Sequence, residues 1–144
     1  MQERITLADY WMGRDVEYSL ALSTDIRAKA ARTVLILNMF LEDAVNAGVT
    51  LERNPRTGSL LSSGWRPPAV NSATPGAAFN SKHMTGEAGD VFDPDGDLDE
   101  WCMSPAGVEA MVKHGLWLEH PSATKGWCHL QIVPPRSGNR VFYP

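Results

Sequence analysis

The chain has 144 residues, a length typical of one domain that can bury a hydrophobic core without the support of disulfide bonds. Hydrophobic residues make up 43% of it and charged residues 21%, and the formal net charge is -4. A mildly acidic chain lacks the excess of Lys and Arg that neutralises nucleic-acid phosphates or anionic membrane surfaces. No run approaches the roughly 20 apolar residues that a membrane span needs. Neither a nucleic acid nor a membrane is therefore an expected partner.

The N-terminus predicts synthesis in the cytoplasm without a secretory leader. Residues 1–4 do not form a basic segment followed by an apolar core. If the substrate lies outside the cell, the protein needs another route to it, such as lysis of the host. The two cysteines, Cys102 and Cys128, are expected to be reduced, because a chain of this size does not need a disulfide.

The first half of the chain predicts helices followed by strands. A short helix and a turn are expected over 6–15. A long helix should run from Ser23 to about Asn46, because Ser23 and its neighbours can cap the first turn and apolar residues recur at helical spacing. Two strands joined by a turn are expected over 49–53 and 59–65.

The second half predicts further short elements. In chain order we expect a loop or short helix over 71–81, a strand over 88–92, a turn over 93–96 that opens a solvated acidic stretch to Glu100, a helix over 104–114, and strands over 116–119 and 127–133. The acidic turn does not fit a calcium loop, because the sixth and twelfth positions are Leu98 and Ser104 instead of Gly and Glu. The whole chain, residues 1–144, is therefore expected to form one α+β domain, with helices packed on a small, mainly antiparallel sheet.

Two His and two acidic residues are concentrated in three short segments of this second half. The segments are 81–90, 118–119 and 126–131. Strand alternation places His129 on the same face as Trp127 and Gln131, while Asp90 lies on one face of its own strand. Catalytic zinc takes three ligands from such residues and keeps a fourth position for water, whose proton a nearby carboxylate can take. The combination, more than any single His, indicates a hydrolytic zinc site.

The pattern Ser81-x-His83-x-x-Gly86-x-Ala88-x-Asp90, a downstream Glu, and Trp127-x-His129 together resemble the zinc D-alanyl-D-alanine carboxypeptidase family. That family includes L-alanyl-D-glutamate endopeptidases used as phage endolysins. The segment from Ser63 to Asn71 resembles it too, and the likeness covers roughly residues 6–144. It implies a hedgehog/DD-peptidase-like fold and one zinc ion per chain. The implied zinc ligands are His83, Asp90 and His129.

The resemblance also implies roles for residues beside the metal. Arg66 would bind a substrate carbonyl or carboxylate and stabilise the oxyanion, since a guanidinium makes two parallel hydrogen bonds to such oxygens. Ser81 would help to place His83 or the substrate. The expected substrate-binding residues are Ser81, Asn71, Trp127 and Gln131.

The general base departs from the pattern of several family members, which carry a Glu three residues before the last His. This chain has Gly126 there. Glu119 is the expected base, because a branch of the family places its Glu at the end of the preceding strand and antiparallel pairing would bring it near His129. Glu87, which is close in sequence to the ligands, is the alternative.

The expected function is a zinc peptidase, a carboxypeptidase or an endopeptidase, that cleaves stem peptides or cross-links of bacterial peptidoglycan. It would act at the cell wall after release, as a phage lysis protein does, or as part of a phage particle. One alternative is a D,D-dipeptidase or carboxypeptidase for small soluble peptides. Another alternative is an inactive metal-bearing domain with a structural or wall-binding role. The presence of Gly126, where several family members carry the catalytic Glu, is the feature that favours this alternative. Pocket shape would decide which bond is cut. Peptidoglycan is the expected partner, and we expect a monomer.

Overall fold

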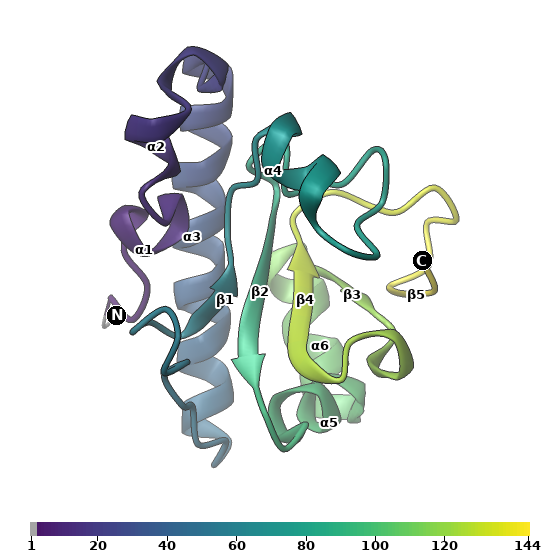
Figure 1. The fold of residues 1–144 in the computed structure, drawn as a ribbon. Helices are drawn as coiled ribbons and strands as arrows, with labels where there is room; N and C mark the ends of the chain where they lie inside the picture. The colour runs from purple at the N-terminus through teal and green to yellow at the C-terminus, as the bar shows by residue number, and fades with distance from the viewer. Residues whose placement is uncertain (1–2) are drawn as a thin grey trace.

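The computed structural model describes residues 3–144, which form helices and one five-stranded sheet (Figure 1). The strands are β1 (Leu61–Ser63), β2 (Ala88–Asp93), β3 (Trp117–Glu119), β4 (Gly126–Gln131) and β5 (Val141–Phe142). Their order in the sheet is β1-β2-β4-β3-β5. The β3–β5 pair is parallel and the other three strand pairs are antiparallel. The predicted α+β class, with its mainly antiparallel sheet, is confirmed.

The helices lie before β1 and in the connections between strands. They are α1 (Leu7–Trp11), α2 (Arg14–Glu17), α3 (Thr24–Asn46), α4 (Pro68–Ala73), α5 (Asp97–Met103) and α6 (Pro105–His114), with single 3₁₀ turns at η1 (Ser19–Ala21) and η2 (Pro121–Ala123). In Figure 1, α3 runs along the β1 side of the sheet, and α6 lies behind β4 and β3. Among the described residues, no helix is long and apolar enough to cross a membrane.

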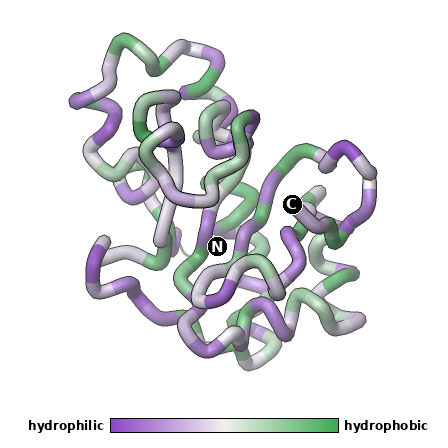
Figure 2. The backbone as a smooth tube through the Cα atoms, turned by 45° about the vertical axis from the view of Figure 1, so that its right-hand side comes forward, coloured by the Kyte–Doolittle hydropathy of each residue, from purple (hydrophilic) through white to green (hydrophobic). Residues whose placement is uncertain are grey.

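The long helix α3 forms where its cap and its apolar stripe predict it. The Ser23 side chain accepts a hydrogen bond from the backbone N–H of Ile26, which satisfies a free donor of the first turn. Leu37, Phe40 and Leu41 are fully buried on the face of α3 that meets the core. Figure 2 shows hydrophilic and hydrophobic stretches alternating over short distances along the backbone, as expected for elements with one buried face.

This packing predicts a position-dependent cost for truncating leucines of α3. Leu37 has 0% exposure, so Leu37→Ala should leave a cavity and lower the free energy of unfolding by about 2–5 kcal/mol. Leu35, two residues away in the same helix, is 50% exposed, and Leu35→Ala should change stability much less. Urea unfolding of both variants measures the difference. Equal losses would mean that α3 does not pack on this face.

The two central strands each present one face to the core. In β4, Cys128 and Leu130 are fully buried, as is Val91 of β2 opposite them. Both cysteines are free, with Cys102 Sγ and Cys128 Sγ 3.9 Å apart. The predicted assignment of the β4 faces is confirmed, and it leaves His129 on the face opposite the core.

Parts of the predicted fold differ from the structure. Residues 49–53 do not form a strand, and β1 covers only three residues of the expected second strand. The turn expected over 93–96 is present, but the acidic residues that follow it form helix α5 instead of a solvated turn, because the buried carboxylate of Asp93 accepts hydrogen bonds from the backbone N–H groups of Leu98 and Asp99. The final strand β5 was not predicted.

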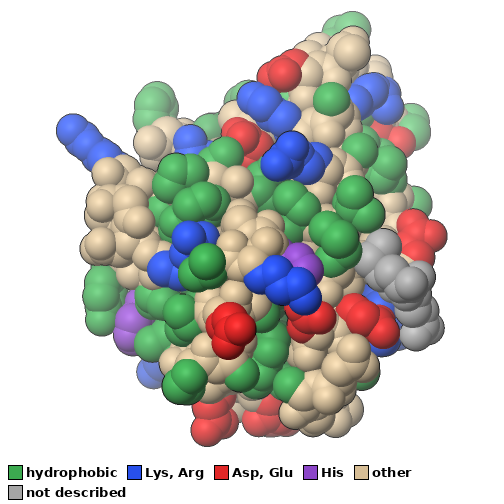
Figure 3. Space-filling view, turned by 180° about the vertical axis from the view of Figure 1, so that it is seen from behind, with side chains coloured by type: hydrophobic (Ala, Val, Ile, Leu, Met, Phe, Trp, Pro, Cys, Tyr) green, Lys and Arg blue, Asp and Glu red, His purple; other side chains and the backbone are tan. Residues whose placement is uncertain are grey.

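The face seen from behind in Figure 3 mixes side chains of all kinds. Basic and acidic groups are interspersed there with hydrophobic ones. Elsewhere, Lys113 and His114 of α6 both contact the carboxylate of Asp43 in α3, at 3.2 and 2.7 Å, and these contacts join the two helices.

Candidate metal centre

His83 lies in the loop before β2, and Gly86 fastens this loop to α3. Gly86 has φ +80°, a conformation that L side chains rarely adopt, and a Cβ there would lie 3.0 Å from the carbonyl oxygen of Ile26. The hydroxyl of Thr33 donates a 2.6 Å hydrogen bond to the Gly86 carbonyl. The glycine of the Ser-x-His-x-x-Gly pattern therefore permits the close approach that anchors the His83 loop.

The same loop is also tied to the connection between β1 and α4. The backbone N–H of Arg66 donates to the His83 carbonyl at 3.1 Å, and the Trp65 indole donates to the Met84 carbonyl at 3.1 Å. The N-terminal helices brace this region, since Arg14 donates to the Trp65 carbonyl and the Tyr10 hydroxyl donates to the carbonyl of Ala88.

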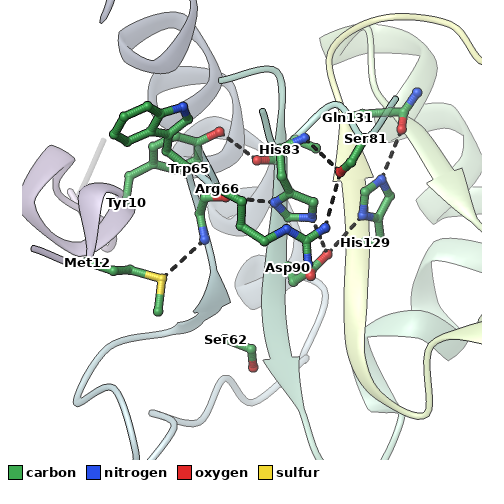
Figure 4. Close-up of polar contacts among 12 residues, drawn as sticks. Tyr10, Met12, Ser62, Trp65, Arg66, Ser81, His83, Asp90, His129 and Gln131 are labelled. Carbon is green, nitrogen blue, oxygen red and sulfur yellow. Dashed lines mark hydrogen bonds and ion pairs between the residues drawn. The ribbon is translucent and has the colours of Figure 1, made fainter. Parts of the chain in front are cut away.

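His83, Asp90 and His129 come together in one buried group (Figure 4). Asp90 of β2 pairs directly with His129 of β4 in the sheet register. Oδ1 of Asp90 lies 3.1 Å from Nε2 of His83 and 2.9 Å from Nδ1 of His129. One ligand atom from each residue lies within 4.8 Å of the other two, close enough for all three to bind one metal ion.

The outer nitrogen of each imidazole is engaged by an oxygen acceptor. Nδ1 of His83 lies 2.7 Å from the Gly64 carbonyl, and Nε2 of His129 lies 2.9 Å from Oε1 of Gln131. The Gly64 carbonyl only accepts, so in a neutral His83 ring Nδ1 carries the proton and Nε2 keeps a lone pair that faces Asp90. His129 has oxygen acceptors at both nitrogens, because its Nδ1 also makes a 2.9 Å hydrogen bond with Oδ1 of Asp90. Nε2 of His83 is buried and makes no hydrogen bond with any residue from 3 to 144.

Burial and the charge interactions with Asp90 set the pKa values of the three residues. Burial lowers the pKa of His83, which favours the neutral ring that a metal requires. Burial alone would also lower the pKa of His129, but the hydrogen bond and charge of Asp90 raise it. Burial opposes ionisation of Asp90 as well, yet its contacts with both histidines hold the pKa of this carboxyl below its usual range. The carboxylate is therefore the fixed negative charge of the group.

Arg66 and Ser81 lie beside this group, as Figure 4 shows. Nη2 of Arg66 donates a 3.1 Å hydrogen bond to Oγ of Ser81, and the same oxygen accepts from the backbone N–H of His83 at 3.2 Å. Nε of Arg66 is buried without a hydrogen-bond partner in the described chain. The guanidinium is thus held near the carboxylates of Asp90 and Glu119, whose charges act on it.

Glu119 lies where antiparallel pairing predicts. The register pairs Trp117 with Gln131 and Leu118 with Leu130, so the next position of β3, Glu119, comes opposite His129. Burial raises the pKa of Glu119, while the nearby charges of His129 and Arg66 lower it. A partly buried carboxyl with a raised pKa suits a group that accepts and returns a proton.

Neither Glu87 nor position 126 supplies a carboxyl on the face of the sheet that carries Asp90 and His129. The charge of Glu87 acts on Lys29 of α3 and on Tyr10, and strand alternation puts it on the face opposite Asp90. Gly126 has φ +99°, a backbone conformation that would strain a Glu at this position. The local backbone therefore disfavours the Glu that the sequence resemblance would place at position 126.

The other residues expected to bind substrate are buried or half-buried. Asn71 of α4 is buried, and its Nδ2 donates to the Ala78 carbonyl, while Oδ1 has no partner among the residues that the structure describes. Trp127 is half-buried. Gln131 is buried and its Nε2 donates to the Val133 carbonyl, so both ends of its amide bind the protein and it orients His129.

One neighbour of the group was missed by sequence reasoning. Phe142 of β5 packs edge-on against the His129 ring, with centroids 6.1 Å apart, and pairs with Glu119 in the sheet. The apolar run Val141-Phe-Tyr after the Gly138 turn was the available signal.

The contact between Gln131 and His129 predicts an effect on metal affinity. Gln131→Leu removes the acceptor that fixes the His129 ring, so we expect metal affinity to fall about 10–100-fold without loss of the fold. Gln131→Glu, which keeps an acceptor oxygen, should retain the affinity. Competition with a coloured chelator measures both. Equal affinity of the wild type and Gln131→Leu would show that the contact does not position the ring.

Comparison of the chain with protein-family models, with curated proteins and with solved structures finds no match in any of the three. The grounds for a function are therefore the geometry and chemistry of this site, together with the motif resemblance of the sequence. The buried group of His83, Asp90 and His129, close enough to bind a metal ion, is the feature on which any proposal rests.

Proposed function

We propose that the protein is a zinc-dependent peptidase that hydrolyses a peptide bond in bacterial peptidoglycan. The observation that carries the proposal is the convergence of two imidazole nitrogens and one carboxylate oxygen, with both outer ring nitrogens hydrogen-bonded to oxygen acceptors. A purely structural His–Asp cluster would place a proton donor on each contact with the carboxylate. Instead, Nε2 of His83 is buried without a hydrogen bond to any described residue.

The donor set fits zinc. Two imidazoles and one carboxylate are a common set for catalytic zinc, which keeps a further position open for water. When bound, zinc lowers the pKa of a coordinated water and polarises the scissile carbonyl. His83, Asp90 and His129 would hold one ion per chain.

The chain's own residues account for the remaining steps. The Arg66 guanidinium, held by Ser81, donates hydrogen bonds to the carbonyl oxygen of the scissile bond as negative charge develops on it. Glu119, opposite His129, accepts the proton of the attacking water and returns it to the leaving amine. Both groups lie beside the proposed ligands, so one bound peptide bond can contact all of them.

The choice of peptidoglycan rests on the sequence resemblance. The Ser-x-His-x-x-Gly-x-Ala-x-Asp and Trp-x-His patterns, with the Ser63–Asn71 segment, resemble peptidases that act on wall peptides. The site geometry is compatible with an endopeptidase or a carboxypeptidase, and with action as a phage-type lysis protein.

Mass spectrometry of the soluble products released from purified peptidoglycan tests the proposal. We expect new fragments that disappear with a chelator and return with zinc, and their new termini name the bond. Free D-Ala-D-Ala should be tested in parallel, because its cleavage without release of wall fragments would point to a dipeptidase. Zinc binding without hydrolysis of any substrate would point to an inactive metal-bearing domain, and either outcome would overturn the proposal.

A further inference from the structure

A second guanidinium, besides that of Arg66, is held at the β5 edge of the sheet (Figure 1). The parallel register of β3 and β5 continues to Arg140, the residue before β5, which comes beside Trp117. Cζ of Arg140 lies 4.4 Å from the centroid of the Trp117 ring, a cation–π contact. Nη1 of Arg140 donates a 2.8 Å hydrogen bond to the Leu116 carbonyl. These two contacts hold the guanidinium in place.

Trp117 and Arg140 lie on the face of the sheet that carries the metal centre. Trp117 pairs with Gln131 in the antiparallel register, and the side chains of directly paired residues point to the same side. The Gln131 amide contacts His129, which identifies this side as the metal face. Strand alternation gives the same result for Arg140, because Phe142, two residues further on, packs against the His129 ring.

The charge of Arg140 has no counter-ion within the described chain. None of the ion pairs among residues 3–144 includes this side chain. Its Nε and Nη2 make no hydrogen bond with those residues, and the half-buried side chain does not enclose them. A guanidinium presents its donors in a rigid fork that matches the two oxygens of a carboxylate. The free donors of Arg140 therefore suit a carboxylate ligand.

The distance from this guanidinium to the metal centre fits a bound peptide. Trp117 is displaced from His129 by one strand and two residues, a separation of roughly 8 Å within the sheet. An extended peptide advances about 3.3–3.6 Å per residue, so the group above Trp117 would be about two residues from a peptide bond at the metal centre. Arg66 follows β1, at the opposite edge of the sheet, so the two guanidiniums flank the metal centre.

We propose that Arg140 binds a free carboxylate of the peptidoglycan stem peptide, about two residues from the bond that is cleaved. The assignment to the stem peptide rests on the proposed function. Arg66 contacts the scissile carbonyl, whereas Arg140 selects peptides that carry a negative charge further along. The same guanidinium repels an ammonium group at this position, so it distinguishes acidic from basic substrate groups.

The binding arm of the test uses Nα-acetyl-D-glutamate as the probe and its uncharged diamide as the match. In ¹H–¹⁵N spectra of the full chain with zinc, we expect the probe to shift the indole signal of Trp117 and the diamide to leave it unchanged. Arg140→Met, which keeps an aliphatic side chain over the indole, should abolish the shift. Arg136→Met, which removes an exposed cation of the same loop, should retain it.

Thermal unfolding of both variants checks the fold. Arg140→Lys, which keeps the charge without the planar fork, provides a second variant and should bind the probe about threefold more weakly than the wild type. An absent shift in the wild type, or an equal shift in a folded Arg140→Met, would overturn the proposal.

The hydrolysis arm separates this proposal from the proposed function. Amidating the carboxylates of a soluble stem peptide should lower kcat/KM about tenfold more for the wild type than for Arg140→Met, with the difference in KM. If the peptide is cleaved but amidation slows both proteins equally, the peptidase stands, the role of Arg140 is solely structural and the carboxylate site fails. If the probe shifts Trp117 but no peptide is cleaved, the stem-peptide assignment falls with the proposed function, while the carboxylate site stands.

Discussion

Replacing Asp90 with Asn is expected to abolish metal binding and hydrolysis together. Oδ1 of Asp90 is the atom that both inner histidine nitrogens approach, at 3.1 and 2.9 Å, so the carboxylate supplies the charge that holds a cation between them. Asn keeps the shape and removes the charge. Bound zinc should fall from one ion per chain to none, measured by elemental analysis after dialysis. Wall hydrolysis should fall by about a thousandfold or more, because metal polarisation is worth several kcal/mol.

The matched control for this change is Asp97→Asn. Asp97 is exposed in the first turn of α5 and does not belong to the metal centre. It should keep full zinc content and activity. Zinc should also raise the Tm of the wild type and of Asp97→Asn, because a ligand that binds the native state stabilises it. The Tm of Asp90→Asn should not change when zinc is added. Full zinc content in Asp90→Asn would mean that the ion lies elsewhere.

The sequence predicted the parts of the fold that depend on local chemistry. Helix α3 begins after Ser23 because that side chain caps the first turn, and its buried stripe repeats at helical spacing from Ala30 to Ala44, about four turns. The alternation in β4 placed Cys128 and Leu130 in the core and His129 on the other face. The three proposed ligands could be named because their residue types and spacing form a recognisable pattern.

Features that depend on long-range packing were harder to predict. The segment 49–53 has residues typical of strands, but it pairs with no strand among residues 3–144. The acidic segment forms helix α5 because the Asp93 carboxylate accepts hydrogen bonds from the backbone N–H groups of its first turn. Composition does not reveal this contact. The role of Gln131 in orienting His129, and the position of Phe142, depend on side-chain contacts that the strand pattern alone leaves open.

Glu119→Gln should separate metal binding from hydrolysis. Glu119 comes opposite His129 in the register and is not one of the three ligands that converge at the metal centre, so the variant should keep one zinc ion per chain. The amide that replaces the carboxylate cannot accept and return a proton. We therefore expect kcat for wall hydrolysis to fall about 10²–10⁴-fold, with KM little changed.

The matched control for Glu119→Gln is Glu87→Gln, because Glu87 is close to the ligands in sequence but acts on Lys29 and Tyr10 on the opposite face. It should retain activity within a factor of about two, since the removed charge contributes no proton transfer at the site. Single-turnover measurements with a defined stem peptide distinguish chemistry from product release. Loss of hydrolysis in Glu87→Gln, with full activity in Glu119→Gln, would exchange the two roles and make Glu87 the general base in place of Glu119. That exchange would require the loop before β2 to turn Glu87 away from α3, against the anchoring of Gly86 by Thr33.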